Sequence, residues 1–290
     1  MYKKINHPVW AFDAEWVPDP AAGRLLYGLQ EEPDDAKVMQ EMWRRGGATA
    51  EEPQPYLKTV LCRMVSIAAV IRREQKGVVD LKLLSLPHDP AGAKAQTGPD
   101  GRAREREVVE PFLQALGKYK PTLVGYNSQA ADLRILVQRG IILGIQARDF
   151  CHRPNKPWEG VDYFARGSDW NIDLKEVVTP GWGPGTPSLH EIATQCGIPG
   201  KMDVSGDQVP NLWLGGQLPR IVAYNEFDAL TTYLLWLRTL YFSGQHSAQQ
   251  HEEEQERVRG LLRREAETAA KPHLLDYLAE WDRLTAAVAR

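Results

Sequence analysis

Strand-like apolar segments dominate the first third of the chain and are separated by polar stretches. Residues 8–17, PVWAFDAEWV, are apolar except for two acids and predict a buried strand. Residues 59–74 and 77–86 are rich in β-branched and other apolar residues on either side of a turn, so we expect an antiparallel hairpin. The polar stretch 18–58 contains one helical pattern, near residues 35–45.

Helical patterns and short apolar segments alternate in the middle of the chain. Residues 87–102 are rich in Gly, Pro and Asp and predict a mobile loop. Apolar residues at helical spacing predict a helix over 104–117, and residues 121–127 predict a short buried strand. The next helix is expected to begin with Ser128 as its N-cap and to end before Gly140.

The last third of the chain is mostly helical in pattern. Residues 170–178 predict a strand or a strand-to-helix junction. Ser188 and Glu191 have the spacing of a capping box and predict the start of a short helix. Residues 217–244 predict a long apolar helix, and the charged tail 245–290 contains two more helical patterns.

This order of elements predicts the fold class. Strands first, followed by alternating strands and helices, are typical of an α/β fold in which helices flank a central mixed sheet. We expect one domain over residues 1–243 and a helical C-terminal extension over residues 244–290, because no Gly- or Ser-rich linker divides the first region.

Amino-acid composition, net charge and cysteine pattern limit the classes of protein to which the chain can belong. The chain has 290 residues, of which 43% are hydrophobic and 25% charged, as in ordinary soluble globular proteins. The net charge of −3 excludes a global basic signature, so any contact with nucleic acid rests on local basic patches or is short and transient. The three cysteines form no CxxC pair, which predicts no zinc cluster and fits a reducing compartment. The chain contains no signal peptide or membrane-spanning run, so we expect a cytoplasmic protein with no membrane partner.

Asp13 and Glu15 lie in the middle of the first predicted strand. Side chains two residues apart on a strand project from the same face, so these carboxylates repel each other and burying either one is costly. Two interpretations are open. An acidic edge strand facing solvent is the commoner meaning of such a pair alone, and a site for a hard divalent cation, which prefers oxygen ligands, is the other.

Two further acids lie on predicted helices. Asp132, taken alone, is most simply a first-turn acid that complements the helix dipole. Asp228 is a single carboxylate on a helix that is apolar almost all round, without Lys or Arg three or four residues away, and a buried carboxylate needs a partner or a metal. Tyr224 lies one turn earlier on the same face. Four carboxylates can hold two divalent ions for phosphodiester cleavage, and the Tyr hydroxyl can orient the attacking water.

In this order, the acids and the tyrosine resemble the motifs of the DEDD superfamily of 3′–5′ exonucleases, in its tyrosine-containing DEDDy branch. The matching motifs are FDAE for Asp13 and Glu15, GYNSQAAD for Asp132, and YNEFD for Tyr224 and Asp228. More narrowly, the stretches VPDPAAGRLLYGL, NIDL and SLHEIATQCGIPGKMDVSGDQV resemble bacterial predicted exonucleases related to the proofreading domain of family-B DNA polymerases.

The resemblance covers roughly residues 8–243 and implies both a fold and an activity. The fold implied is ribonuclease H-like. The activity implied is hydrolysis of single-stranded nucleic acid, with DNA favoured, from its 3′ end to release nucleoside monophosphates. Two Mg²⁺ or Mn²⁺ ions per active site are implied: Asp13 bridges both, Glu15 and Asp228 hold the ion that activates water, and Asp132 acts on the second.

Four residues are candidate substrate contacts. Trp16 and Val17 leave the first strand beside the acids, where they can stack on or wedge against the terminal base, although Trp16 is equally well explained as a core residue. The resemblance adds Asn127, at the Asn position of the second motif, and Lys201, which matches a family lysine and is expected to meet a phosphate. Trp16 stands where many relatives have Thr. Ser-Gln-Ala-Ala precedes Asp132 where relatives often have a Gly-containing run that ends in an aromatic residue.

A local excess of positive charge follows the second motif. Residues 134–156 contain only one acid, Asp149, against the basic residues Arg134, Arg139, Arg148, Arg153 and Lys156. Such a strip either tracks a phosphate backbone or is a solvated face, and both interpretations are open. Asp173 either approaches the site or caps the following helix, and the capping role is favoured.

These features favour a metal-dependent 3′–5′ exonuclease. One alternative is a non-catalytic nucleic-acid-binding module that retains the fold, which the presence of all four acids disfavours. Another is an adaptor that binds a protein partner through its C-terminal helices. Turnover of DNA or RNA with Mg²⁺ or Mn²⁺ distinguishes the enzyme from the binding module, and deletion of residues 245–290 distinguishes catalysis from the adaptor role.

Overall fold

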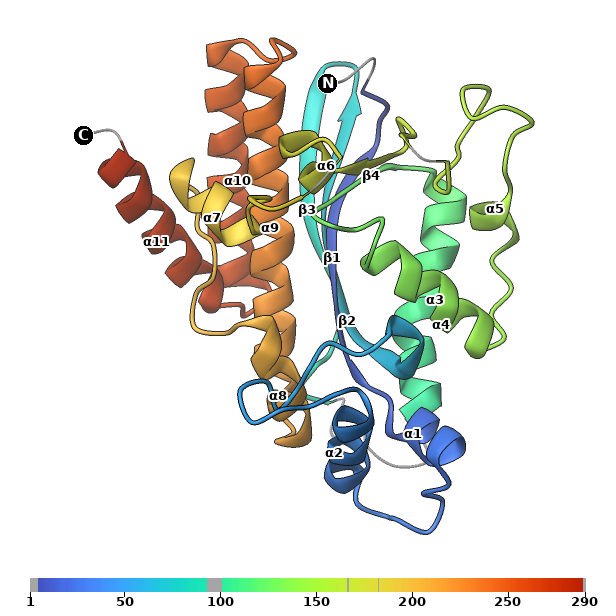
Figure 1. Ribbon diagram of the computed structural model, residues 1–290. Coiled ribbons are helices and arrows are strands. Elements are labelled where there is room, and N and C mark those ends of the chain that lie inside the picture. The colour runs from blue at the N-terminus through green and yellow to red at the C-terminus, as the bar shows by residue number, and fades with distance from the viewer. Residues whose placement is uncertain (1–4, 93–100, 166, 182, 289–290) are drawn as a thin grey trace.

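A central mixed β-sheet organises the computed structural model, which describes residues 5–92, 101–165, 167–181 and 183–288 (Figure 1). Within those residues, five strands pair in the order β3-β2-β1-β4-β5. They are β1 (Val9–Pro18), β2 (Cys62–Gln75), β3 (Val78–Leu86), β4 (Thr122–Gly125) and β5 (Asn171–Asp173). The β1–β2 and β2–β3 pairs are antiparallel, whereas β1–β4 and β4–β5 are parallel. This order and these directions are those of the ribonuclease H-like fold, as expected.

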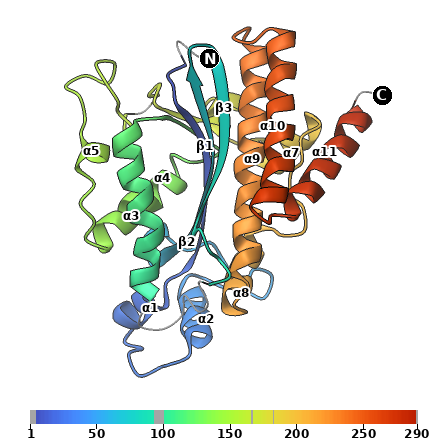
Figure 2. The ribbon, with the colours of Figure 1, turned by 180° about the vertical axis from the view of Figure 1, so that it is seen from behind.

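Helices cover both faces of the sheet, as two opposite views show (Figures 1 and 2). One face carries α3 (Gly101–Tyr119), α4 (Asp132–Ile142) and α5 (Arg148–Cys151). The other carries α7 (Leu189–Gln195), α9 (Leu218–Phe242), α10 (Ala248–Thr268) and α11 (His273–Val288). The remaining helical segments are α1 (Pro20–Tyr27), α2 (Asp35–Arg45), η1 (Thr59–Leu61), α6 (Leu174–Val178), η2 (Gly206–Gln208) and α8 (Val209–Leu214).

The alternation of side chains along β1 divides the interior into two cores. Trp10 and Phe12 pack in the core under α3, whereas Val9 and Ala11 pack in the core under α9. Because side chains two residues apart share a face, the next residues on the α9 side are Asp13 and Glu15. The strand therefore presents its two acids to α9, at the point where the apolar core on that side ends.

Most of the predicted elements are confirmed. The helix near residues 35–45 is α2, the hairpin is β2–β3, and the capping box of Ser188 and Glu191 opens α7. Residues 170–178 form the expected strand-to-helix junction, β5 followed by α6. The loop predicted over 87–102 lies partly outside the described residues.

The start and end of the helix after the second motif were predicted wrongly. α4 begins at Asp132, its N-cap position is Ala131, and it continues through Gly140 to Ile142. Asn127 adopts a left-handed φ of 65°, and its carbonyl accepts hydrogen bonds from the backbone N–H groups of residues 130 and 131. A tight turn therefore occupies the place where Ser128 was expected to cap the helix. The short helices α1 and α8 were not predicted.

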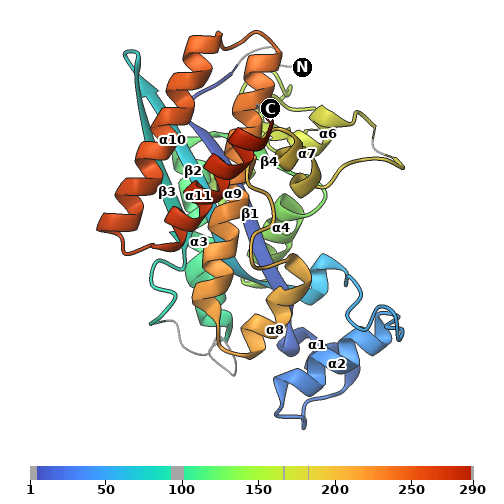
Figure 3. The ribbon, with the colours of Figure 1, turned by 90° about the vertical axis from the view of Figure 1, so that its left-hand side faces the viewer.

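The C-terminal helices pack across α9, as the side view shows (Figure 3). Val258 and Leu261 of α10 and Tyr277 of α11 are fully buried in the same core as α9. Buried polar contacts reinforce the packing, among them an ion pair of 2.8 Å between Arg72 of β2 and Glu254 of α10. The division into residues 1–243 and 244–290 stays a prediction. In the described part of the chain, no helix has the length and apolar character needed to cross a membrane.

Candidate active site

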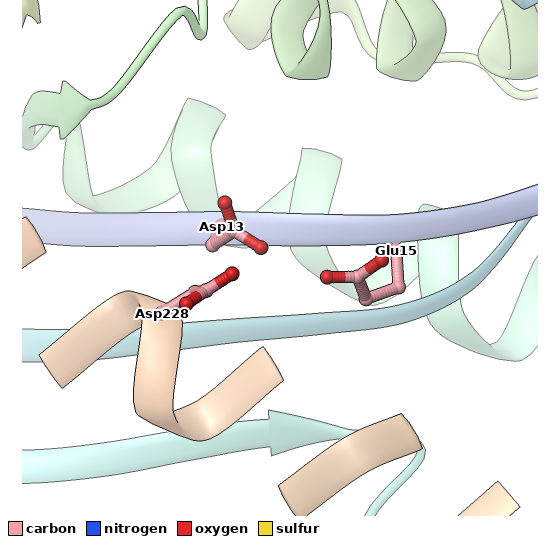
Figure 4. Close-up of side chains that lie close together, drawn as sticks. All are labelled: Asp13, Glu15 and Asp228. Carbon is pink, nitrogen blue, oxygen red and sulfur yellow. The ribbon is translucent and has the colours of Figure 1, made fainter. Parts of the chain in front are cut away.

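Three carboxylates from two elements meet between β1 and α9 (Figure 4). Asp13 and Glu15 project from β1, and Asp228 projects toward them from α9. One carboxylate oxygen of each lies within 4.8 Å of the others, which is close enough for a shared cation. The strand period and the packing of α9 on β1 together produce this group, and the expected convergence of these three acids is confirmed.

Asp132 lies beside this group, at the start of α4. Its side chain is buried, and its Oδ1 accepts a hydrogen bond of 3.1 Å from the backbone N–H of Ala14, between the two acids of β1. Asp132 lines the same cleft but is not one of the three carboxylates that lie within 4.8 Å of each other.

The electrostatics of the group favour a cation. Burial, followed by the charges of the neighbouring acids, raises the pKa of Asp13 and of Glu15 well above its usual value. Burial also raises the pKa of Asp132 to about 7 and that of Asp228 to about 6. Lys201 opposes the shift at Asp228, but one lysine does not neutralise four acids. Clustered carboxylates with raised pKa values are typical of functional sites, and oxygen donors of this kind suit Mg²⁺ or Mn²⁺.

Asn225 orients Asp13 and was not identified from the sequence. Its Nδ2 donates a hydrogen bond of 2.7 Å to Asp13 Oδ2, and its Oδ1 accepts one of 3.1 Å from the hydroxyl of Ser66 on β2. Both Asn225 and Ser66 are fully buried. The chain Ser66–Asn225–Asp13 fixes the rotamer of the first carboxylate, which is the arrangement expected of groups that support a metal ligand.

Tyr224 is buried and lies one helical turn before Asp228 on α9. Its hydroxyl lies near the Asp228 carboxylate, and this interaction lowers the pKa of the acid. Burial and the charges of Asp228, Glu15 and Asp13 raise the pKa of Tyr224 above its usual range, so the phenol stays protonated and is available as a donor. The expected convergence of this hydroxyl and carboxylate is confirmed.

These residues line one cleft of about 540 Å³. The four acids and Tyr224 contribute to its wall, and so do three of the predicted substrate contacts, namely Trp16, Asn127 and Lys201. Val17 does not line the cleft. Its side chain is completely buried in the core, so the expectation that it contacts substrate is wrong.

Asp173 has the structural role that was favoured. Its side chain caps α6 by accepting from the backbone N–H of Lys175 at 3.0 Å. The same carboxylate accepts from the backbone N–H of Asn127 at 2.7 Å and of Gln129 at 3.1 Å. Asp173 therefore braces the turn that leads into Asp132, which the sequence did not indicate.

The predicted basic strip is broken in the structure. Arg139 is completely buried and pairs with Glu105 and with Asp19, in the latter case at 3.0 Å. Arg153 and Lys156 pair with Asp162 and Glu159, and Arg134 and Arg148 are exposed. The residues do not form one continuous positive surface, because their neighbours in space, unlike their neighbours in sequence, include acids.

The chain belongs to the family of predicted 3′–5′ exonucleases related to the exonuclease domain of PolB, and a sequence model of that family matches residues 54–281. Asp132, Tyr224 and Asp228 lie inside the matched residues, whereas Asp13 and Glu15 precede them. No curated protein sequence matches the chain.

Among solved structures, the family B DNA polymerase from the hyperthermophilic archaeon Pyrobaculum calidifontis is similar, with 18% sequence identity and a TM-score of 0.41. The match covers 89% of this chain and 29% of the polymerase.

Proposed function

We propose that the protein is a two-metal-ion 3′–5′ exonuclease of the DEDDy branch. The observation that carries this proposal is the convergence of Asp13, Glu15 and Asp228, whose oxygens lie within 4.8 Å of one another with Asp132 beside them. Stability alone gives no reason for burying four acids against a single nearby lysine. Membership of the exonuclease family supports the same conclusion.

In this proposal Asp13, Glu15, Asp132 and Asp228 would together hold two divalent ions. When bound, Mg²⁺ or Mn²⁺ would supply Lewis-acid stabilisation of the charge that develops on the attacking and leaving oxygens. The protein's part is to keep the carboxylates fixed, through the hydrogen bonds from Asn225 to Asp13 and from the Ala14 N–H to Asp132.

The remaining lining residues act on water and substrate. The protonated hydroxyl of Tyr224 can donate to or accept from the attacking water and align it with the phosphorus. Lys201 offers a positive charge to a phosphate oxygen, and Trp16 and Asn127 contact the terminal nucleotide. The products are a nucleoside 5′-monophosphate and a chain shortened by one residue.

The proposed substrate is the 3′ end of single-stranded nucleic acid, with DNA favoured because the family is related to the exonuclease domain of a DNA polymerase. A protein partner bound through α10 and α11 remains a prediction. The apolar sides of these helices are buried against α9, so such a partner would meet their charged faces.

Incubation of 5′-labelled single- and double-stranded DNA and RNA with Mg²⁺, Mn²⁺ or chelator tests the proposal. We expect a ladder of products shortened from the 3′ end, lost in chelator and in the Asp13→Asn variant. Asp80→Asn is the matched control, since it removes a carboxylate from the exposed side of β3 and should cleave like wild type. The proposal fails if no substrate is shortened with either metal, or if Asp13→Asn retains full metal-dependent activity.

A further inference from the structure

An aromatic corner adjoins the acids in the cleft. Tyr56 is 69% exposed, and its ring packs edge-on against Trp16 with the centroids 6.4 Å apart and the planes at 84°. Both rings line the same cleft as the four acids. An edge-on pair leaves both faces of one ring uncovered by the other, so this corner offers a flat apolar surface to a ligand in the cleft.

A β-bulge in β2 lies opposite Glu15 and Trp16 of β1, and both of these residues line the cleft. Glu15 of β1 pairs with Ser66 of β2, but Trp16 pairs with Met64, so Val65 is an extra residue in β2. Consecutive side chains on a regular strand face opposite sides, yet Glu15 and Trp16 both line the cleft. A bulge adds twist and redirects side chains, and bulges are frequent beside active sites. Since the Cα atoms of residues 15 and 16 are about 3.8 Å apart, the rings and the acids are within reach of one nucleotide.

Residues before and after Tyr56 in the sequence anchor the segment that carries it. It belongs to the segment between α2 and η1, which crosses beside α8 (Figure 3). Two residues before it, Gln54 donates a hydrogen bond of 3.2 Å to Asn211 of α8. One residue after it, Leu57 is buried in the core. These contacts anchor the backbone that carries the exposed ring on the cleft wall.

The cleft has a polar part and an apolar part, as a nucleotide does. The acids provide oxygen ligands at one part of the wall, and Trp16, Tyr56, Trp43 and Pro55 provide apolar surface at another. A 3′-terminal nucleotide has a charged phosphate on one side and a flat base on the other. Every base has a π-face, so stacking on such a corner does not depend on sequence.

We propose that Tyr56, together with Trp16, binds the base of the 3′-terminal nucleotide. This inference rests on the proposed exonuclease function and adds a base-recognition site to it. Tyr56 contributes binding that is equal in the bound substrate and in the transition state, so its loss raises KM with little change in kcat.

The test is a thermodynamic cycle. The ring of Tyr56 is removed from the protein and the 3′-terminal base is removed from the oligonucleotide, first separately and then together. Two 5′-fluorescein oligothymidylates are compared, one with a complete 3′-terminal nucleotide and one whose last residue is abasic. Binding is followed by anisotropy with Ca²⁺ in place of Mg²⁺, and hydrolysis is measured with Mg²⁺ or Mn²⁺. The proteins are wild type, Tyr56→Ala, Tyr56→Phe and, as a control on an exposed aromatic at the end of α9, Phe242→Ala.

We expect wild type, Tyr56→Phe and Phe242→Ala to bind the complete oligonucleotide about 5- to 100-fold more tightly than the abasic one. Tyr56→Ala should lose most of this difference, because the ring and the base interact with each other. The inference is overturned if Tyr56→Ala discriminates between the two oligonucleotides as wild type does.

The two proposals can fail separately. Hydrolysis by wild type combined with no effect of Tyr56→Ala on discrimination refutes the base site and leaves the exonuclease intact. Absence of hydrolysis, combined with discrimination that depends on Tyr56, refutes the exonuclease and supports the base site.

Discussion

Replacing Asp228 by Asn should stabilise the metal-free protein while abolishing its activity. Burial raises the pKa of Asp228 from 3.8 to about 6, which means that the folded state disfavours the charged form. A shift of this size corresponds to about 3 kcal/mol at a pH above both values. Asn removes the charge and keeps an oxygen that accepts from Tyr224, but it loses the attraction to Lys201. We therefore expect a gain of about 1–3 kcal/mol in the free energy of unfolding.

The sign of this effect depends on pH. A carboxyl group whose pKa is raised on folding binds more protons in the folded state, so its contribution to stability falls as pH rises from about 4 to about 6. In chelator, wild type should lose stability over this range while Asp228→Asn loses less. The advantage of the variant should be full at pH 8 and small at pH 4.

Thermal unfolding in chelator at both pH values measures the difference, and for a chain of this size the gain corresponds to roughly 2–5 °C at pH 8. Excess Mg²⁺ or Mn²⁺ should reverse the order, because an ion that binds the folded state stabilises wild type and has lost a ligand in the variant. Asp80→Asn should follow wild type throughout. An Asp228→Asn variant that is no more stable than wild type in chelator at pH 8, or whose gain is the same at pH 4, would contradict this prediction.

Four further substitutions test the contacts around the acids of the cleft and around buried Glu226. Asn225→Leu removes the donor to Asp13, so kcat should fall about 10- to 100-fold with a circular dichroism spectrum like that of wild type; an unchanged kcat would contradict the positioning role. Tyr224→Phe should lower kcat at least about 10-fold while Mn²⁺ still raises the unfolding temperature, and loss of that metal effect would assign the hydroxyl to metal binding instead. Lys271→Met leaves buried Glu226 with fewer partners and should cost about 3 kcal/mol in urea unfolding. Adding Glu226→Leu should recover part of that loss, and simple additivity would contradict the coupling.

Patterns that depend on neighbours in the sequence were predicted well. The period of two in β1 placed Asp13 and Glu15 on one face, and the helical spacing of Tyr224 and Asp228 placed both on one side of α9. The capping box of Ser188 and Glu191 likewise involves residues three apart. Such patterns are set by local backbone geometry, which does not depend on the rest of the fold.

One expectation was wrong, and one pair of interpretations stayed open, where the environment comes from distant residues. Val17 was expected to wedge against a base, but its side chain is completely buried in the core. Arg139 looks like part of a positive strip, although Glu105 and Asp19 bury and neutralise it. Neither outcome follows from the residues on either side in the sequence.

Periodicity and residue chemistry are local properties, so they were enough to predict most strands, the main helices and the shared face of Asp13 and Glu15. The folded chain was needed to find how Ser66 and Asn225 hold Asp13, how Asp173 braces the turn before Asp132, and where Tyr56 meets Trp16. Asn225 and Ser66 are 159 residues apart in the sequence, and their hydrogen bond exists because α9 packs across β2 and β1. Contacts of this kind arise from packing, which brings together side chains that are far apart in the sequence and share no local pattern.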